Sequence, residues 1–170
     1  MRTNPPLSMC CAMAFVDYLS LRCLQDPGFA ALLRRADNLS TEYLCWETLA
    51  AFEVDLTCAD ERRAFAMIAA AIGRSTQRHN GNLLLGQAIC ALGGSRGSEQ
   101  VKAHLRRLLA CDDLKEVCQI LRPLLLLIQS RVSLSLDYAA LLMDLTDFPS
   151  SGEGVRARWA QQFYSKMEIQ

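Results

Sequence analysis

The chain has 170 residues, of which 51% are hydrophobic, and only nine glycines and five prolines interrupt them. This length and composition suit one soluble body with a substantial core, built as a single domain or as two packed helical subdomains. Its 18 Lys and Arg residues balance its 18 Asp and Glu residues, so the formal net charge is zero. This balance excludes attraction of the whole chain to nucleic acid, and any such binding requires a patch of segregated basic side chains.

Helical periodicity runs through nearly every segment of the chain. Apolar residues recur at three- and four-residue steps after Arg62 and again after Tyr138, and no segment alternates convincingly like a strand. We predict an all-α fold of roughly eight helices in two packed helical subdomains. Residues 1–73 would form an N-terminal helical subdomain, 74–82 a basic linker loop, and 83–170 a C-terminal helical bundle.

Clusters of Gly, Pro, Asn, Asp and Ser separate the predicted helices. In chain order, breaks are expected at 26–28, 38, 53–57, 73–82, 93–97, 112–113, 133–136 and 148–154. Pro27 suits the first position of a helix. Five further side chains can accept a hydrogen bond from the amides of a following first turn: Ser40, Thr57, Ser98, Asp112 and Asp137.

The longest apolar run covers residues 123–128 and lies between Arg122 and Arg131. It is far shorter than the ~20 residues that cross a bilayer, so it predicts a buried helix, and no membrane partner is expected. Pro123 removes a backbone hydrogen bond and crowds the preceding turn. We therefore expect a kink or a helix break near Arg122.

Eight cysteines would indicate disulfides in a short secreted protein, yet the N-terminal segment does not read as a charged and then apolar leader. We expect a reducing cytoplasm. The chain has no Cys-x-x-Cys and only two histidines, so neither a metal nor another cofactor is predicted. The pair Cys10-Cys11 is read as two small helical residues, with a soft-metal site as the alternative. The remaining six are expected in the core: Cys23, Cys45, Cys58, Cys90, Cys111 and Cys118.

Catalytic motifs are not legible in the sequence. No Ser-His-Asp, Cys-His or paired-carboxylate pattern appears, and the glycines at 93–97 lack the Gly-Lys-Ser/Thr ending of a phosphate-binding loop. A nonenzymatic binding module is therefore the favoured interpretation.

The last third of the chain carries the most informative pattern. Asp137 to Leu142 reads DYAALL, and 155–164 reads VRARWAQQFY. This spacing resembles the C-terminal signature of the small subunit of the type I-E CRISPR Cascade complex, the CasB family, in which DYA-x-LL-x-DL precedes VR-x-x-WA-x-x-FY. Similar short matches follow the same order upstream, at 15–19, 28–35, 85–88 and 105–110.

The resemblance implies a small, all-helical, noncatalytic subunit of a crRNA-guided antiviral complex. Such a subunit pairs with a second copy of itself and contacts the backbone and large subunits. Its basic face would hold the crRNA–target DNA hybrid and the displaced strand through phosphates, independently of sequence, and so favour the open R-loop.

Basic residues are the candidate contacts to nucleic acid. Lys102 and Arg106 are four residues apart and share a helix face, and Arg96 lies just before them; the resemblance favours phosphate contacts over a merely solvated face. Arg122 matches a family Leu-Arg position, and Arg131 would extend the track. The full candidate set is Arg34, Arg35, Arg62, Arg74, Arg78, Lys102, Arg106, Arg107, Arg122, Arg131, Arg156 and Arg158.

Three alternatives remain open at this point. The 74–82 loop is either a flexible basic segment that follows a phosphate backbone or a solvated linker. Trp159 and Phe163 share a helix face, which favours core anchors over a base-stacking platform. The rival function is a helical adaptor that binds a protein partner through an exposed apolar groove, with the arginines serving solubility.

Overall fold

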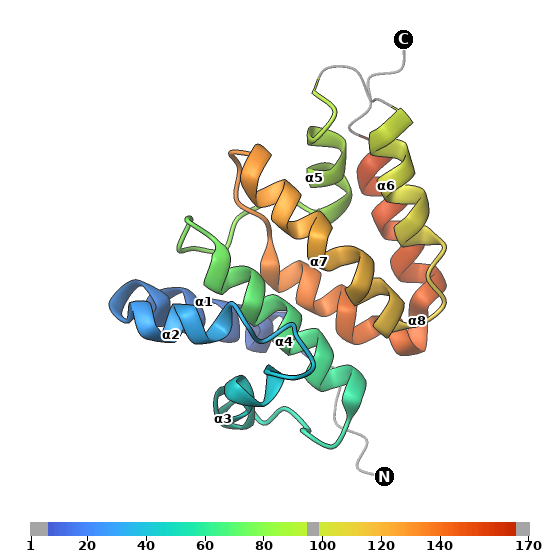
Figure 1. Ribbon diagram of the computed structural model, residues 1–170. Coiled ribbons are helices and arrows are strands. Elements are labelled where there is room, and N and C mark those ends of the chain that lie inside the picture. The colour runs from blue at the N-terminus through green and yellow to red at the C-terminus, as the bar shows by residue number, and fades with distance from the viewer. Residues whose placement is uncertain (1–6, 95–98, 166–170) are drawn as a thin grey trace.

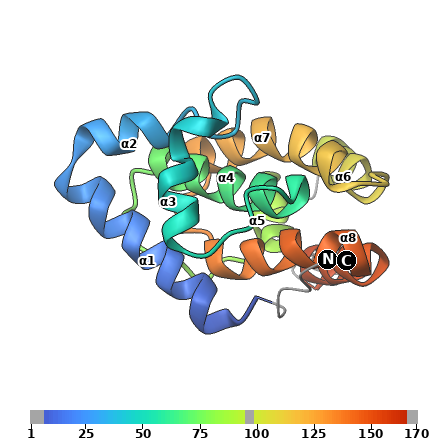
Figure 2. The same cartoon turned by 90° about the horizontal axis from the view of Figure 1, so that it is seen from below.

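The computed structural model describes residues 7–94 and 99–165, and these ranges are all-helical, as the sequence predicts. Figure 1 shows the helices, and the view turned by 90° in Figure 2 keeps α2 and α6 at opposite ends. In chain order the elements are α1 (Met9–Gln25), α2 (Pro27–Leu33), the 3-10 helix η1 (Glu42–Cys45), α3 (Trp46–Ala51), α4 (Ala59–Arg74), α5 (Leu85–Ala91), α6 (Glu99–Leu109), α7 (Leu114–Arg131) and α8 (Tyr138–Tyr164).

Helix α4 is the centre of the fold, with α1, α2, α7 and α8 packed around it. Residues 64–73 are all buried, as expected for a helix without a polar face. Alanines between the large apolar residues let the neighbouring helices approach closely. At Gly73 a Cβ would lie 2.9 Å from the Cβ of Leu33, so the α2 contact depends on the missing side chain.

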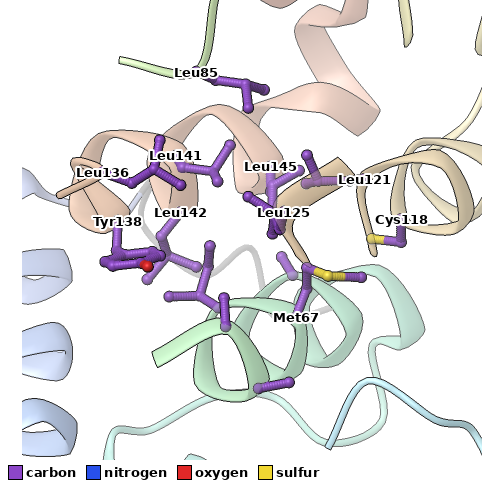
Figure 3. Packing of buried hydrophobic residues seen from close by; sticks show 14 of the residues in the cluster. Met67, Leu85, Cys118, Leu121, Leu125, Leu136, Tyr138, Leu141, Leu142 and Leu145 are labelled. Carbon is purple, nitrogen blue, oxygen red and sulfur yellow. The ribbon is translucent and has the colours of Figure 1, made fainter. Parts of the chain in front are cut away.

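The core is one continuous cluster that runs through both predicted subdomains, and the division at 74–82 stays a prediction. In Figure 3 the buried side chains of three helices meet: Met67 from α4, Leu121 and Leu125 from α7, and Leu141, Leu142 and Leu145 from α8. In the described ranges no helix is both long and apolar enough to cross a membrane.

Of the kink or break expected near Arg122, the break does not occur, because α7 continues through Pro123 from Leu114 to Arg131. Proline costs one hydrogen bond and crowds the preceding turn. Buried leucines on both sides of Pro123, including Leu121 and Leu124, pack into the core and hold the helix together. Tertiary packing has outweighed the local preference.

The break predicted at 148–154 is found at Ser151, although α8 is continuous on both sides of it and no loop forms. The helix instead bends at Ser151, whose φ of −137° and ψ of 36° are not helical. Across the bend, the rings of Phe148 and Trp159 stack with centroids 5.9 Å apart. The bend lets both halves of α8 face the same core.

Residues 75–84 form a joint between α4 and the start of α8. The Asn80 Oδ1 atom accepts hydrogen bonds from the amides of Tyr138 at 2.7 Å and Ala139 at 3.2 Å. Its Nδ2 atom donates to Asp137 Oδ1 at 2.9 Å. Asp137 itself caps α8 by accepting from the Ala140 amide, as predicted. The loop is therefore bound to the residues that begin α8, and contact of its basic side chains with a phosphate backbone stays a prediction.

The other predicted helix starts have mixed outcomes. Pro27 does begin α2, and α7 is capped by Asp113 in place of Asp112. Ser40 and Thr57 cap no helix; their hydroxyls bond to Asn38 and Asp55. Ser98, Arg96 and part of the 93–97 break lie outside the described residues. Of the six cysteines expected in the core, only Cys58 is exposed, at the position before α4.

Candidate nucleic-acid interface

A cleft of about 340 Å³ opens between α4, α7 and the segment that follows α2. We call it the α4–α7 cleft. Its lining combines a small apolar floor with charged and amide groups. The lining residues are Ala36, Asp37, Asn38, Leu39 and Glu42 from the segment after α2, Arg63, Ala66 and Met67 from α4, and Lys115, Cys118, Gln119 and Arg122 from α7.

Asp37 draws together arginines that lie far apart in the sequence. Its side chain is completely buried, and Arg74 donates to both carboxylate oxygens at 2.6 Å. Arg122 reaches the same carboxylate at 3.2 Å and remains 46% exposed. The second terminal nitrogen of Arg74 also donates to the backbone oxygen of Arg34, whose own side chain donates to the oxygen of Gly73. Two predicted candidates, Arg74 and Arg122, therefore meet at Asp37, and Arg122 also lines the cleft.

The carboxylates around the cleft are already engaged by arginines. Glu42 is buried and pairs with Arg62, whose guanidinium also lies 5.3 Å from the Trp46 ring centroid. Arg63 pairs with Asp60 at 3.1 Å. Lys115 is exposed and has no carboxylate partner in the ranges 7–94 and 99–165. A surplus of positive charge is left at the cleft.

On the candidate surface of α6, two of the cations share one carboxylate. Glu99 accepts from Lys102 at 3.1 Å and from Arg106 at 3.4 Å. The hydrogen bond from Lys102 and the two nearby positive charges hold the pKa of Glu99 below its usual value. This carboxylate therefore stays ionised and offsets part of the positive charge of the pair. Arg107 is exposed beside them.

Several other predicted contacts hold the fold together. Arg62 and Arg74 are only 20% and 16% exposed in their ion pairs. Arg78 and Arg156 donate to the backbone oxygens of Ile72 and Cys111, at 2.8 and 2.7 Å respectively. Arg158 binds Asp144 through two nitrogens at 3.0 and 2.8 Å.

Arg35 and Arg131 are exposed, and neither pairs with a described carboxylate. Arg131 lies nine residues beyond Arg122, about two and a half turns, so it projects from the other side of α7. The structure therefore does not bring Arg131 to the cleft. Whether any single candidate contacts nucleic acid stays a prediction.

Trp159 and Phe163 are both fully buried, which confirms them as core anchors and excludes an exposed stacking platform. Lys115 and Gln119 were not among the sequence candidates, although a signal was present. Lys115, Gln119 and Arg122 follow the four- and three-residue spacing of one helix face. That spacing on α7 would have identified this side of the cleft.

Comparisons with known proteins give a consistent result. The family model described as CRISPR-associated protein Cse2 matches residues 30–164. A Cse2-family CRISPR-associated protein from Thermus thermophilus has 25% identity and a TM-score of 0.72, and the alignment covers 91% of this chain and 97% of that one. Among curated proteins no sequence gives a significant match.

Two further solved structures share the fold. CasB from M. ruber is 23% identical with a TM-score of 0.74, over 91% of this chain and 93% of that chain. A chain of a CRISPR RNA-guided surveillance complex is 22% identical with a TM-score of 0.75, over 94% and 93% respectively.

Proposed function

Because the chain belongs to the Cse2 family of CRISPR-associated proteins, we propose that it is a noncatalytic, nucleic-acid-binding subunit of a cytoplasmic crRNA-guided surveillance complex. The resemblance to the CasB family, the small subunit of type I-E Cascade, is confirmed by this family match over residues 30–164. The surveillance complex that contains a chain of the same fold supports the assembly. Its partners would be crRNA, target DNA, the other Cascade subunits and a second copy of itself.

The observation that carries the binding function is the convergence of Arg63, Lys115 and Arg122 at one cleft whose carboxylates are engaged. Cations in this arrangement would contact phosphates without reading bases. The guide would read the sequence, and this subunit would lower the free energy of the open R-loop. R-loop formation is a nearly balanced strand exchange in a different guided effector, so a few phosphate contacts can shift it.

The purified chain is expected to bind single-stranded and double-stranded DNA, each with an affinity that varies little between unrelated sequences and falls steeply with salt. Each phosphate contact releases counterions, which makes the logarithm of the binding constant fall linearly with the logarithm of salt concentration. Fluorescence anisotropy over a salt series measures this slope. Absence of binding even at low salt would contradict the proposal for the isolated chain.

Two double variants with equal charge change identify the binding surface. Lys115→Ala with Arg122→Ala should weaken binding to all sequences alike and flatten the salt slope by about one per residue removed. Lys102→Ala with Arg106→Ala should have the smaller effect, because Glu99 already offsets part of their charge. The same anisotropy titration compares them. A larger loss of DNA affinity in the Lys102→Ala, Arg106→Ala variant would instead assign the binding surface to α6.

A protein adaptor is the second candidate function, and exposed apolar side chains favour it. Leu21 and Leu24 on α1 are exposed one turn apart, and Leu39 and Tyr43 are exposed near the cleft. In a multisubunit complex these side chains are suited to contacts with neighbouring subunits. The adaptor function would replace nucleic-acid binding if the chain joined the complex but neither double variant changed DNA affinity of the assembly.

A further inference from the structure

We propose that the α4–α7 cleft holds one unpaired nucleotide of a single strand, with its base against the apolar floor and its phosphates at the cationic rim. This inference rests on the proposed nucleic-acid binding and adds a contact to the base. Phosphate contacts alone would need only a charged surface. The cleft offers apolar side chains beside the charges.

The floor consists of Ala66, Met67 and Cys118, which are almost completely buried beneath the opening. Figure 3 shows Met67 and Cys118 coming from the facing helices α4 and α7. Burial raises the pKa of the Cys118 thiol to about 12, so the sulfur stays protonated and neutral at physiological pH. A neutral, polarizable floor of this kind is suited to the face of a nucleobase.

Gln119 supplies the polar groups beside the floor. Its side-chain amide is exposed, and it offers two donors and one acceptor to the edge of a base. Its backbone oxygen also cannot receive the usual helical bond, because the residue four positions later is Pro123. Groups that both donate and accept can bond to more than one base, which fits binding without sequence specificity.

The rim provides the charge for the phosphates. Lys115 and Arg122 lie seven residues apart on α7, about two turns, with Gln119 between them. Arg63 faces them from α4. Five cations stand against three carboxylates in the cleft and its ion pairs, which leaves a positive surplus. These groups are Arg62, Arg63, Arg74, Lys115 and Arg122, and Asp37, Glu42 and Asp60.

The size of the cleft decides between possible occupants. A volume of about 340 Å³ lies at the lower end of the range for small-molecule sites, and it suits a single nucleotide unit. A duplex is too wide to enter. A carboxylate from a partner protein would satisfy the cations but would leave the apolar floor uncovered.

The test separates the base from the phosphates. The full chain is titrated with oligothymidylate and with an abasic deoxyribose-phosphate oligomer of equal length, at the same low salt. Because base contacts in single-strand binders contribute at least about fivefold in affinity, oligothymidylate should bind about fivefold more tightly or better. Thymidine monophosphate is the third probe and reports whether the free nucleotide alone occupies the site.

Two variants with the same chemical change locate the base contact. Gln119→Glu places a carboxylate between Lys115 and Arg122, four and three residues away on one helix face, where it would pair with both and displace the nucleotide. Gln161→Glu adds the same charge at an exposed position of α8 outside the cleft. In Gln119→Glu the affinities for oligothymidylate and for the abasic oligomer should become nearly equal. In Gln161→Glu the preference for oligothymidylate should persist.

Each outcome has a defined meaning. Equal affinity of the two oligomers for the unmodified chain would overturn the base contact and leave phosphate binding intact. A preference that survives Gln119→Glu would place the base contact elsewhere and would also overturn the inference. Binding of thymidine monophosphate as tightly as the oligomer would assign the cleft to a free small molecule. No binding of either oligomer would remove the proposed function together with this site.

Discussion

Gly86→Ala is expected to destabilise the fold by about 3 kcal/mol, at the upper end of the usual cost of overpacking. Gly86 lies on α5 where this helix crosses α8. An added Cβ would lie 2.2 Å from the backbone oxygen of Trp159 and 2.8 Å from the backbone nitrogen of Phe163. The Gly86 amide also donates to the Gln162 side chain at 3.0 Å. Because backbone atoms cannot turn aside as side chains do, the two helices must separate.

Gly154→Ala is the matched control. Gly154 lies on the last part of α8, and apart from its own helix backbone and chain neighbours no atom of the described residues is within 4 Å of the position its Cβ would take. Alanine there should stabilise the helix by up to about 1 kcal/mol. Urea denaturation followed by circular dichroism measures both variants. Equal free energies of unfolding for Gly86→Ala and the unmodified chain would show that α5 and α8 do not meet this closely.

Asp144→Ala is the second change with a large expected effect. The Asp144 carboxylate joins both sides of the α8 bend, because it accepts from Arg158 through one oxygen and from the Trp159 indole nitrogen at 2.8 Å through the other. Trp159 is fully buried, so its indole N–H would lose this hydrogen-bond partner. An unsatisfied buried donor costs about 1–3 kcal/mol, and we expect a loss of about 2–3 kcal/mol in total.

Asp147→Ala is the control for this change. Asp147 contacts the same Arg158 at 3.6 Å, but both side chains are nearly half exposed. Solvent screens such a pair, so the variant should change the free energy of unfolding by less than about 0.5 kcal/mol. Equal losses in the free energy of unfolding for the two variants would mean that Asp144 stabilises the fold through Arg158 and not through the Trp159 indole.

The pH dependence of stability gives a second measure of Asp144. Burial raises its pKa above the ordinary value, and the hydrogen bonds from Arg158 and Trp159 oppose that rise. The folded carboxyl therefore holds a proton where the unfolded one has released it. Its contribution to stability is greatest below the ordinary pKa and declines as pH rises through the raised value. In Asp144→Asn this decline should be absent from unfolding curves recorded across the acid range.

The sequence was sufficient for the class of fold and for several local features. The spacing of Trp159 and Phe163 identified core anchors, and Asp137 identified the start of α8. Pro123 misled because burial of neighbouring leucines maintained the helix where local preference opposed it, whereas the break expected within 148–154 occurs as a bend at Ser151. The helix-breaking preference of a residue takes no account of the tertiary packing that can hold the helix together.

The candidate site was predictable only in its residue types. Arginines at 74 and 122 could be named from the sequence, but their meeting at Asp37 joins a loop to two helices and has no local signal. The sequence also did not show which of the candidate arginines are held in ion pairs within the fold. The structure shows that some basic residues, such as Arg62, hold segments of the fold together in ion pairs. Others, such as Lys115, remain exposed.

The start of α8 depends on Asn80, a residue from the other half of the chain, for its first hydrogen-bond acceptor. The first amides of α8 find their acceptor in the loop after α4, so neither half contains all the partners needed to begin and secure this helix. A chain divided within 75–84 would therefore not yield two self-sufficient fragments. We therefore expect the chain to unfold in a single cooperative transition.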